Sequence, residues 1–524
     1  MATQIASLVA ALLLLDASLA FENVWPTPAI TWTGELSVEL AVVVLVLAIV
    51  GASGGRVGRR VVRWVSALWV LLVLGRYADV TAPALYGRDV NLYWDLRFVP
   101  DVVKMVTTVT RAGLVLGALV GTVAALALLY VLVWIAWRRI GRAVADRRER
   151  TALLVASVAA IVVFTAQQAS EHLLQHPRFA APVTAAYARQ ARFALTALTA
   201  SAYVPPSPSM TGDLAAVRGA DVFVVFVEAY GAVTYTRPEI ASALAPARAS
   251  LAAAVRDTDR RVVSAFVESP TFGGSSWLAH ISLLSGIEVK DPDRNARLMT
   301  ERRDTLPRAF GRRGFRTVAL MPGLRIGWPE GAFYGFDEIY GAERLAYHGP
   351  EFGWFAIPDE YSLQRLDALE VSKSDRPPLF VFFPTISTHF PFNPIPPYQP
   401  DWTRMTDPHP YDGPSIVKAY GREMDWVNFT PVYADAIAYD LTTIAGYLRL
   451  RANRDFVMVV LGDHQPAAAV SGAHASWNVP VHVIANRGSV LEKLRADGFV
   501  DGLAPARAIG KMNELTPMLL SAFQ

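Results

Sequence analysis

Long apolar runs fill the first third of the chain. Five stretches stand out, with approximate bounds 5–21, 36–53, 61–74, 112–137 and 152–167. A bilayer core is crossed by about 20 apolar helical residues. The second and fourth stretches approach or exceed that length, and the third and fifth reach it with their flanks. We therefore predict an N-terminal polytopic α-helical membrane region of about five spans over residues 1–167. The first stretch contains Asp16 and also fits a signal peptide, although no Lys or Arg precedes it.

Basic residues in the connecting segments indicate the orientation. Segments 54–60 and 138–150 are rich in arginine, whereas segment 22–35 has no basic residue. Arginine-rich loops stay in the cytoplasm. We therefore expect both arginine-rich segments inside, segment 22–35 outside, and the chain beyond about Gln168 outside as well.

The second half alternates short apolar runs with helical patterns. The predicted strands are 221–227, 261–267, 315–321, 378–383, 456–461 and 479–485, and the predicted helices include 239–257, 306–313 and 433–451. This alternation is typical of an α/β domain whose sheet is covered on both faces. We expect a connector over residues 168–219, ending near Pro205-Pro206-Ser207-Pro208, and a catalytic domain over residues 220–524. Ligands in such domains bind beyond the strand ends.

Composition excludes several chemistries. The chain has 49 Lys and Arg against 46 Asp and Glu, so no general basic surface for nucleic acid is indicated. It has no cysteine, which rules out disulfides, thiolate zinc sites and a cysteine nucleophile.

Polar side chains follow two of the predicted strands. Glu228 comes directly after the strand 221–227, and Asp463 and His464 follow the strand 456–461 and Gly462. A carboxylate and an imidazole together suit a divalent cation. Taken separately, Glu228 is equally compatible with a surface cap, and an Asp-His pair is common.

A glycine-rich serine motif, Gly273-Gly274-Ser275-Ser276, follows a third strand and leads into an apolar helix. Glycines and a helix N-terminus favour a bound anion. No histidine is adjacent in sequence to act as a base, so a serine nucleophile here would depend on a metal. The alternative is a serine that caps a buried helix.

The order of these three motifs resembles that of the alkaline phosphatase superfamily, and most of all its lipoteichoic acid synthase and phosphoglycerol transferase branch. Phosphoethanolamine transferases are similar. The resemblance covers about residues 221–485 and extends to the N-terminal spans. Segments 328–337, 384–392 and 433–448 also look like family segments. The resemblance implies a sulfatase-like domain with a mixed, mostly parallel central sheet.

The resemblance implies a role for each matching residue. The metal ligands would be Glu228, Ser276, Asp463 and His464, and Ser276 would replace the family's usual threonine nucleophile, with Ser275 as the alternative. The substrate-binding residues would be His389, His474, Trp402 and Arg404, although Trp402-Thr403-Arg404 lies farther from the histidine than the family pattern. Some relatives have a histidine beside the tyrosine of the penultimate helix, whereas this chain has Ala438-Tyr439-Asp440, which leaves the identity of the acceptor or headgroup open.

The implied enzyme is a metal-dependent transferase of a bacterial inner membrane, with its catalytic domain in the periplasm. It would move a phosphoglycerol-type headgroup from a phospholipid, such as phosphatidylglycerol, to a glycan or lipid acceptor of the envelope. An oxygen-rich ligand set suits Mn²⁺ and also admits Mg²⁺ or Zn²⁺. The enzyme could instead be a phosphoethanolamine transferase or a phosphohydrolase. Phosphoethanolamine transferases commonly carry disulfides, which this chain cannot form. An inactive envelope-binding membrane protein is another alternative. Ser276-Trp-Leu-Ala-His280 lacks the sulfatase C/S-x-P-S-R motif.

Overall fold

The computed structural model describes residues 2–25, 27–109, 112–169, 179–199 and 203–524. They form two compact units, Met1–Ala200 and Ser201–Gln524. Each unit is described by itself. Residues 170–178 and 200–202 of the expected connector lie outside the described residues.

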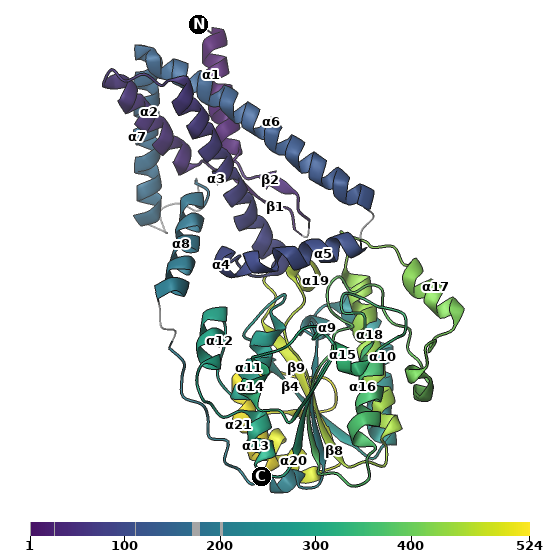
Figure 1. The fold of residues 1–524 in the computed structure, drawn as a ribbon. Coiled ribbons are helices and arrows are strands. Elements are labelled where there is room, and N and C mark those ends of the chain that lie inside the picture. The colour runs from purple at the N-terminus through teal and green to yellow at the C-terminus, as the bar shows by residue number, and fades with distance from the viewer. Residues whose placement is uncertain (1, 26, 110–111, 170–178, 200–202) are drawn as a thin grey trace. The chain divides into compact units, whose positions relative to one another are not determined.

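The first unit consists mainly of helices, with one small hairpin in which β1 pairs antiparallel with β2 (Figure 1). Its elements are α1 Ala2–Ala17, β1 Phe21–Asn23, β2 Ile30–Trp32, α2 Val38–Ala52, α3 Arg59–Tyr86, α4 Leu92–Asp95, α5 Val99–Val109, α6 Ala112–Ala145, α7 Arg147–Ala169 and α8 Val183–Thr199.

Three helices of the described chain, α3, α6 and α7, are long and apolar enough to cross a membrane. The prediction of about five spans is therefore too high. The stretches 61–74 and 152–167 looked short, but polar and basic residues at their ends extend them into α3 and α7, which have 28 and 23 residues. The stretches 5–21 and 36–53 form the shorter helices α1 and α2, of 16 and 15 residues.

Buried aromatic and polar contacts join the helices of this unit. The rings of Trp69 on α3 and Trp137 on α6 meet edge to face, with centroids 5.1 Å apart. The Trp69 indole nitrogen donates to Ser18 Oγ over 2.9 Å. Asp16, the charged residue of the first apolar stretch, is buried and accepts from the backbone nitrogen of Ser37 over 2.8 Å. Asp16 thus links α1 to the residue that caps α2.

The second unit is built on a nine-stranded sheet with the order β10-β4-β9-β8-β3-β7-β5-β6, in which β11 also pairs with β4. The strands are β3 Asp221–Val227, β4 Arg261–Glu268, β5 Arg316–Met321, β6 Glu338–Gly341, β7 Leu379–Pro384, β8 Phe456–Gly462, β9 Asn478–Ala485, β10 Val500–Asp501 and β11 Ala508–Lys511. Strands β6, β5, β7, β3 and β8 pair in parallel, whereas β9 is antiparallel to both β8 and β4. The predicted mixed, mostly parallel sheet is confirmed.

Helices cover both faces of this sheet (Figure 1). The helices of this unit are α9 Val233–Thr236, α10 Pro238–Asp257, α11 Ser276–Ser285, α12 Pro292–Met299, α13 Leu306–Gly311, α14 Gly331–Tyr334, α15 Ala342–Leu345, α16 Asp359–Leu366, α17 Gly413–Gly421, α18 Thr430–Leu450, α19 Ala468–Ser471, α20 Gly488–Ala496 and α21 Leu515–Phe523, of which α17 projects away from the sheet.

Two hydrophobic cores result, one on each face. Side chains of a strand point alternately to its two faces. In β3, Phe223 and Val225 enter the core with α10, α16 and α18, whereas Val222 and Val224 enter the core with α11, α13, α20 and α21. This two-sided burial explains why the central strands are continuously apolar.

Candidate metal and nucleophile site

Two neighbouring parallel strands bring Glu228 and Asp463 together. In the register of β3 and β8, Val227 pairs with Gly462. Glu228 and Asp463 are the next residues of the two strands, so they leave the sheet side by side at its carboxyl edge. Gly462 is required there because a Cβ would lie 1.8 Å from the carbonyl oxygen of Tyr230.

Ser276 reaches the same edge from β4. This strand is antiparallel to β9, which is antiparallel to β8, so β4 ends at the edge where β3 and β8 end. The loop after β4 is bound to the loop after β8. Ser269 Oγ donates to the carbonyl of Asp463 over 2.5 Å, and Gly273 N donates to the carbonyl of Gln465 over 3.0 Å. Ser276 then begins α11.

The side chains of Glu228, Ser276, Asp463 and His464 form one group, which we call the edge cluster. Ser276 Oγ donates to Glu228 Oε2 over 2.8 Å and lies 3.1 Å from His464 Nε2. His464 Nε2 lies 3.3 Å from Glu228 Oε1. It also lies 3.7 Å from Asp463 Oδ2. All four predicted ligand residues therefore meet, and Ser276 rather than Ser275 has the hydroxyl in these contacts.

Backbone contacts orient the ligand atoms of the edge cluster. Asp463 Oδ1 accepts from Ala229 N over 2.8 Å and from His464 N over 2.7 Å. Asp463 Oδ2 is buried and has no hydrogen-bond partner among the described residues. His464 Nδ1 lies 2.7 Å from the carbonyl oxygen of Gln465. A proton on Nδ1 satisfies that carbonyl, so in the neutral ring Nε2 presents its lone pair to the cluster.

The charges of the edge cluster favour a cation at its centre. Burial raises the pKa of Asp463, and the nearby Glu228 charge adds to this, to about 8. Burial lowers the pKa of His464, but the charges of Asp463 and Glu228 outweigh burial and raise it to about 9. Burial also raises the pKa of Glu228, but the hydrogen bond and charge of His464 outweigh it and hold this pKa below its ordinary value. Two buried carboxylates this close stay ionised together only when a positive charge accompanies them.

The donor set fits a divalent cation. One ligand atom each from Glu228, Asp463 and His464 lies within 4.8 Å of the others, and all three residues are buried. Asp463 Oδ2 is a buried acceptor without a hydrogen-bond partner among the described residues, so it is available to a cation. Two carboxylates, an imidazole and a hydroxyl suit Mn²⁺, Mg²⁺ or Zn²⁺.

The two predicted substrate histidines differ in their surroundings. His389 follows β7, which is the other parallel neighbour of β3, and it lies near enough to contribute to the lowered pKa of Glu228. Its Nδ1 lies 2.7 Å from the carbonyl oxygen of Phe390, and Phe355 meets its ring edge to face. His474 is exposed and has φ of 57°. Among the described contacts, none joins His474 to the edge cluster.

Trp402 and Arg404 lie apart from these contacts. Trp402 is buried in the core, where its ring lies 5.8 Å from that of Tyr447 and its Nε1 donates to Tyr398 over 3.3 Å. Arg404 is exposed on the same short helix, Trp402–Thr406. No contact of the described residues links either one to the edge cluster, so their substrate-binding role stays a prediction.

Sequence reasoning missed the residues that hold Glu228 in place. Thr385 Oγ1 accepts from Glu228 N over 3.1 Å and donates to the buried Asp440 over 2.8 Å. Thr388 Oγ1 donates to the carbonyl of Glu228 over 2.7 Å. Both threonines follow β7, so their position after a buried strand was the signal available.

His280 was also missed. It lies one helical turn beyond Ser276 on α11, and its ring packs against Phe226 and Phe382, with centroids 4.7 and 5.4 Å away. Burial lowers the pKa of His280 to about 4, which keeps the ring neutral. Its spacing of four residues from Ser276 places the two on one helix face, and that spacing was visible in the sequence.

Comparison with known proteins gives one family match. The sulfatase family model matches residues 269–486, a segment that includes Ser276, Asp463 and His464 and begins after Glu228. No curated protein matches the chain in sequence.

Several solved structures are similar to this one at low sequence identity. The integral membrane lipooligosaccharide phosphoethanolamine transferase A of Neisseria meningitidis has 13% identity and a TM-score of 0.51, over 99% of this chain and 95% of that chain. The lipoteichoic acid synthase LtaP of Listeria monocytogenes has 15% identity and a TM-score of 0.36, over 54% and 69% of the two chains. The Streptococcus pyogenes phosphoglycerol transferase GacH, in complex with sn-glycerol-1-phosphate, has 13% identity and a TM-score of 0.38, over 60% and 78%. At 13% identity, the similarity to the Neisseria meningitidis structure is a similarity of fold.

Proposed function

Because residues 269–486 carry a sulfatase-family domain, we propose that this chain is a membrane-anchored, metal-dependent transferase of the alkaline phosphatase superfamily. It moves a phosphoglycerol-type headgroup from a phospholipid to a glycan or other envelope acceptor. The observation that carries the proposal is the position of the Ser276 hydroxyl at a helix start, 2.8 Å from Glu228 and 3.1 Å from His464. The proposal keeps residues 1–167 as membrane region, 168–219 as connector and 220–524 as catalytic domain.

In this proposal Glu228, Ser276, Asp463 and His464 hold one divalent cation, with Mn²⁺ as the first choice. A bound divalent cation lowers the pKa of a hydroxyl ligand and polarises a phosphoryl oxygen. The buried carboxylates exclude water and fix the Ser276 side chain, while the N-terminus of α11 favours the incoming phosphate.

Ser276 Oγ attacks the phosphorus of the donor headgroup, and its proton passes to the carboxylate of Glu228, to which the hydroxyl already donates. The bond between phosphorus and the diacylglycerol oxygen breaks, and that oxygen takes up the proton that Glu228 had accepted. An acceptor hydroxyl then attacks the phosphoserine, the bond between phosphorus and Ser276 Oγ breaks, and the proton of the acceptor hydroxyl passes through Glu228 to Ser276 Oγ. His389 and His474 bind the phosphate or the headgroup. Two half-reactions through a covalent intermediate give ping-pong kinetics.

The test uses the full-length protein in vesicles that contain phosphatidylglycerol with a labelled headgroup, assayed with and without added Mn²⁺. We expect diacylglycerol release and transient label on Ser276, found by mapping the phosphopeptide. Parallel vesicles with labelled phosphatidylethanolamine test the alternative headgroup. Label from that lipid alone would replace the phosphoglycerol assignment. Release of free headgroup phosphate in the presence of acceptors would indicate a phosphohydrolase.

An inactive envelope-binding protein is the alternative from another class. It predicts glycan or lipid binding without diacylglycerol release from either donor. A control with Ser276→Ala separates turnover by this chain from that of a contaminant, because the contaminant's activity would persist in the variant.

A further inference from the structure

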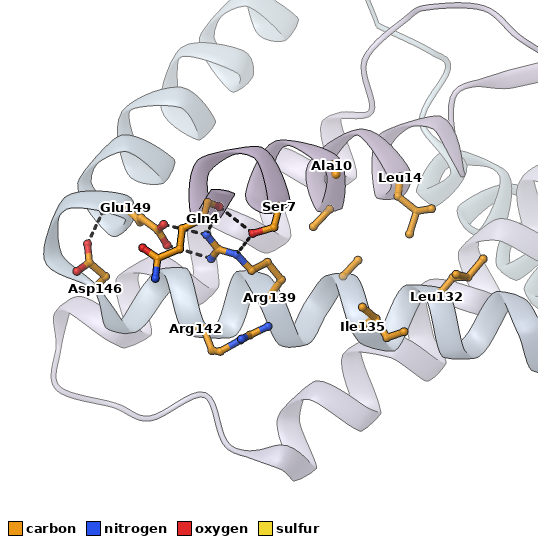
Figure 2. A pocket seen from close by; sticks show the side chains of 12 residues that line it. Gln4, Ser7, Ala10, Leu14, Leu132, Ile135, Arg139, Arg142, Asp146 and Glu149 are labelled. Atoms are coloured by element: carbon orange, nitrogen blue, oxygen red, sulfur yellow. Dashed lines mark hydrogen bonds and ion pairs between the residues drawn. The ribbon is translucent and has the colours of Figure 1, made fainter. Parts of the chain in front are cut away.

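The membrane unit contains a cavity of about 540 Å³ between α1 and the end of α6 that leads into α7. Its lining is divided by chemistry. Figure 2 shows charged and polar side chains, among them Ser7, Arg139 and Arg142, at one end, and Leu14, Leu132 and Ile135 toward the other. The cavity thus has a polar end and an apolar end along the helix axes, which matches the polar headgroup and apolar acyl chains of a lipid.

Most charges at the polar end are already paired within the protein. Arg139 donates to both carboxylate oxygens of Glu149, over 3.0 and 2.8 Å. It also donates to Ser7 Oγ over 2.9 Å and to the carbonyl of Gln4 over 2.6 Å. Asp146 accepts from the backbone nitrogens of Arg148 and Glu149 at the start of α7.

Arg142 is the exception. It lines the cavity and is exposed, and within the described parts of the chain no hydrogen bond or ion pair joins it to a protein group. The lining has two arginines and two carboxylates, but both carboxylates are engaged by Arg139 or by backbone nitrogens. The polar end therefore presents one guanidinium that has no hydrogen bond or ion pair to the described protein groups, and guanidinium groups bind phosphates through paired hydrogen bonds.

The apolar end is equally unfilled by protein. Leu14 and Leu132 are each 39% exposed, and Ile135 is 52% exposed. Ile135 and Arg142 are seven residues apart on α6, so they share a helix face and are separated by about 10 Å along the axis. Because α6 is long and apolar enough to span a membrane, these side chains meet acyl chains rather than water.

We propose that this cavity binds an anionic phospholipid, with its phosphate on Arg142 and one acyl chain along Leu14, Leu132 and Ile135. The site lies in the membrane unit and shares no residue with the edge cluster, so it goes beyond the proposed transfer reaction. In the orientation proposed from the arginine-rich segment 138–150, the bound lipid belongs to the cytoplasmic leaflet. It is a resident lipid that fixes α1 against α6, distinct from the donor.

The first test measures lipid retention by native mass spectrometry of the full-length protein. The delipidated protein is titrated with phosphatidylglycerol or with phosphatidylcholine of the same acyl chains. Loss of a charge-assisted contact predicts that Arg142→Gln weakens phosphatidylglycerol binding about tenfold. Phosphatidylcholine binding should weaken less, because its choline cation offsets the charge of the phosphate. Arg148→Gln is the matched control, because it removes the same charge from a neighbouring exposed position outside the cavity lining. Equal effects of the two substitutions, or no effect of Arg142→Gln, would overturn the proposal.

The second test does not depend on charge loss. A photoreactive benzophenone residue replaces Ile135 in the cavity, or Leu128 on the same helix outside its lining, in nanodiscs of equal parts phosphatidylglycerol and phosphatidylcholine. We expect cross-links at position 135 to be enriched in phosphatidylglycerol and those at position 128 to follow the bulk composition. Excess inorganic phosphate should leave the enrichment intact. Its removal by phosphate would indicate a free-anion site, and equal ratios at both positions would mean no specific lipid site.

Discussion

Two non-glycine residues next to the edge cluster adopt a left-handed backbone conformation. Ala229, with φ of 57°, follows Glu228, and Ser275, with φ of 62°, precedes Ser276. Each such residue costs of order 1–3 kcal/mol and persists where the surroundings hold it. Ala229 is held in part by the Tyr433 hydroxyl, which donates to its carbonyl over 2.8 Å. Strained backbone beside both partners of the Ser276–Glu228 hydrogen bond is typical of a preorganised site.

Substitution of Ser276 should reduce headgroup transfer far more than substitution of the adjacent Ser275. Ser276→Ala removes the hydroxyl that contacts Glu228 and His464, so we expect headgroup transfer to fall by about a thousandfold or more. Ser275→Gly suits the positive φ at that position and should keep most of the activity. Ser276→Thr should retain substantial activity, since it keeps a hydroxyl. Initial rates of diacylglycerol release measure all three, and a larger loss in Ser275→Gly than in Ser276→Ala would exclude Ser276 as the nucleophile.

Asp463 allows its two oxygens to be tested separately. Asp463→Asn keeps an oxygen that accepts from Ala229 N and His464 N but turns the free acceptor into a donor and removes the charge. We expect this variant to lose bound metal and activity while its thermal unfolding midpoint, measured without metal, stays close to that of the parent. Asp463→Ala should lose metal and also unfold at a lower temperature. Metal content by elemental analysis is the readout, and full metal occupancy in Asp463→Asn would place the cation elsewhere.

At the scale of elements, the sequence predicts what burial dictates. The central strands β3, β7 and β8 were predicted to within a residue because buried parallel strands are continuously apolar. Strands β6, β10 and β11 have four residues or fewer and were missed, since no apolar run marks them.

The candidate site divides in the same way. Glu228, Asp463 and His464 follow apolar runs directly, so their meeting at one sheet edge could be anticipated. The positions of Thr385 after a strand and of His280 four residues beyond Ser276 are visible in the sequence, but their contacts depend on partners distant in sequence, which no local pattern identifies. Trp402 and Arg404 were placed by motif alone, without a strand end to support them.

The junction of β8 with the loop after it depends on Gly462. A Cβ at this residue would lie 1.8 Å from the Tyr230 carbonyl oxygen, so Gly462→Ala must push apart the end of β8 and the loop after Glu228. We expect a loss of about 1–3 kcal/mol in the free energy of unfolding, together with loss of metal binding. Gly421→Ala, where no atom lies within 4 Å of the added carbon, is the control for the loss of a glycine. Chemical denaturation of both variants measures the difference, and an unperturbed Gly462→Ala protein would mean that this close approach does not exist.

At the scale of the whole molecule, the membrane unit determines which side of the bilayer the second unit faces. The arginine-rich segment 54–60 leads into α3, and segment 138–150 covers the end of α6 and the start of α7. They predict that the chain beyond Gln168 is outside the cytoplasm. A phosphatase reporter that is active only outside, fused after Gln168, should be active. The same reporter fused after Arg56 should be inactive. The opposite pattern would reverse the proposed topology and contradict the proposed transfer to an envelope acceptor.

The pairing of β4 has a consequence for when the protein becomes active. Every described partner of β4, namely β9, β10 and β11, lies beyond residue 477, although β4 itself ends at Glu268 and leads to Ser276. A growing chain therefore carries its nucleophile segment for more than about 200 residues of synthesis before the neighbours of that strand exist. Pairing between such distant segments is late because the loop between them must close first. The Ser276 segment thus joins the edge cluster only after β9 has been synthesised, so a shorter, unfinished chain does not assemble this site.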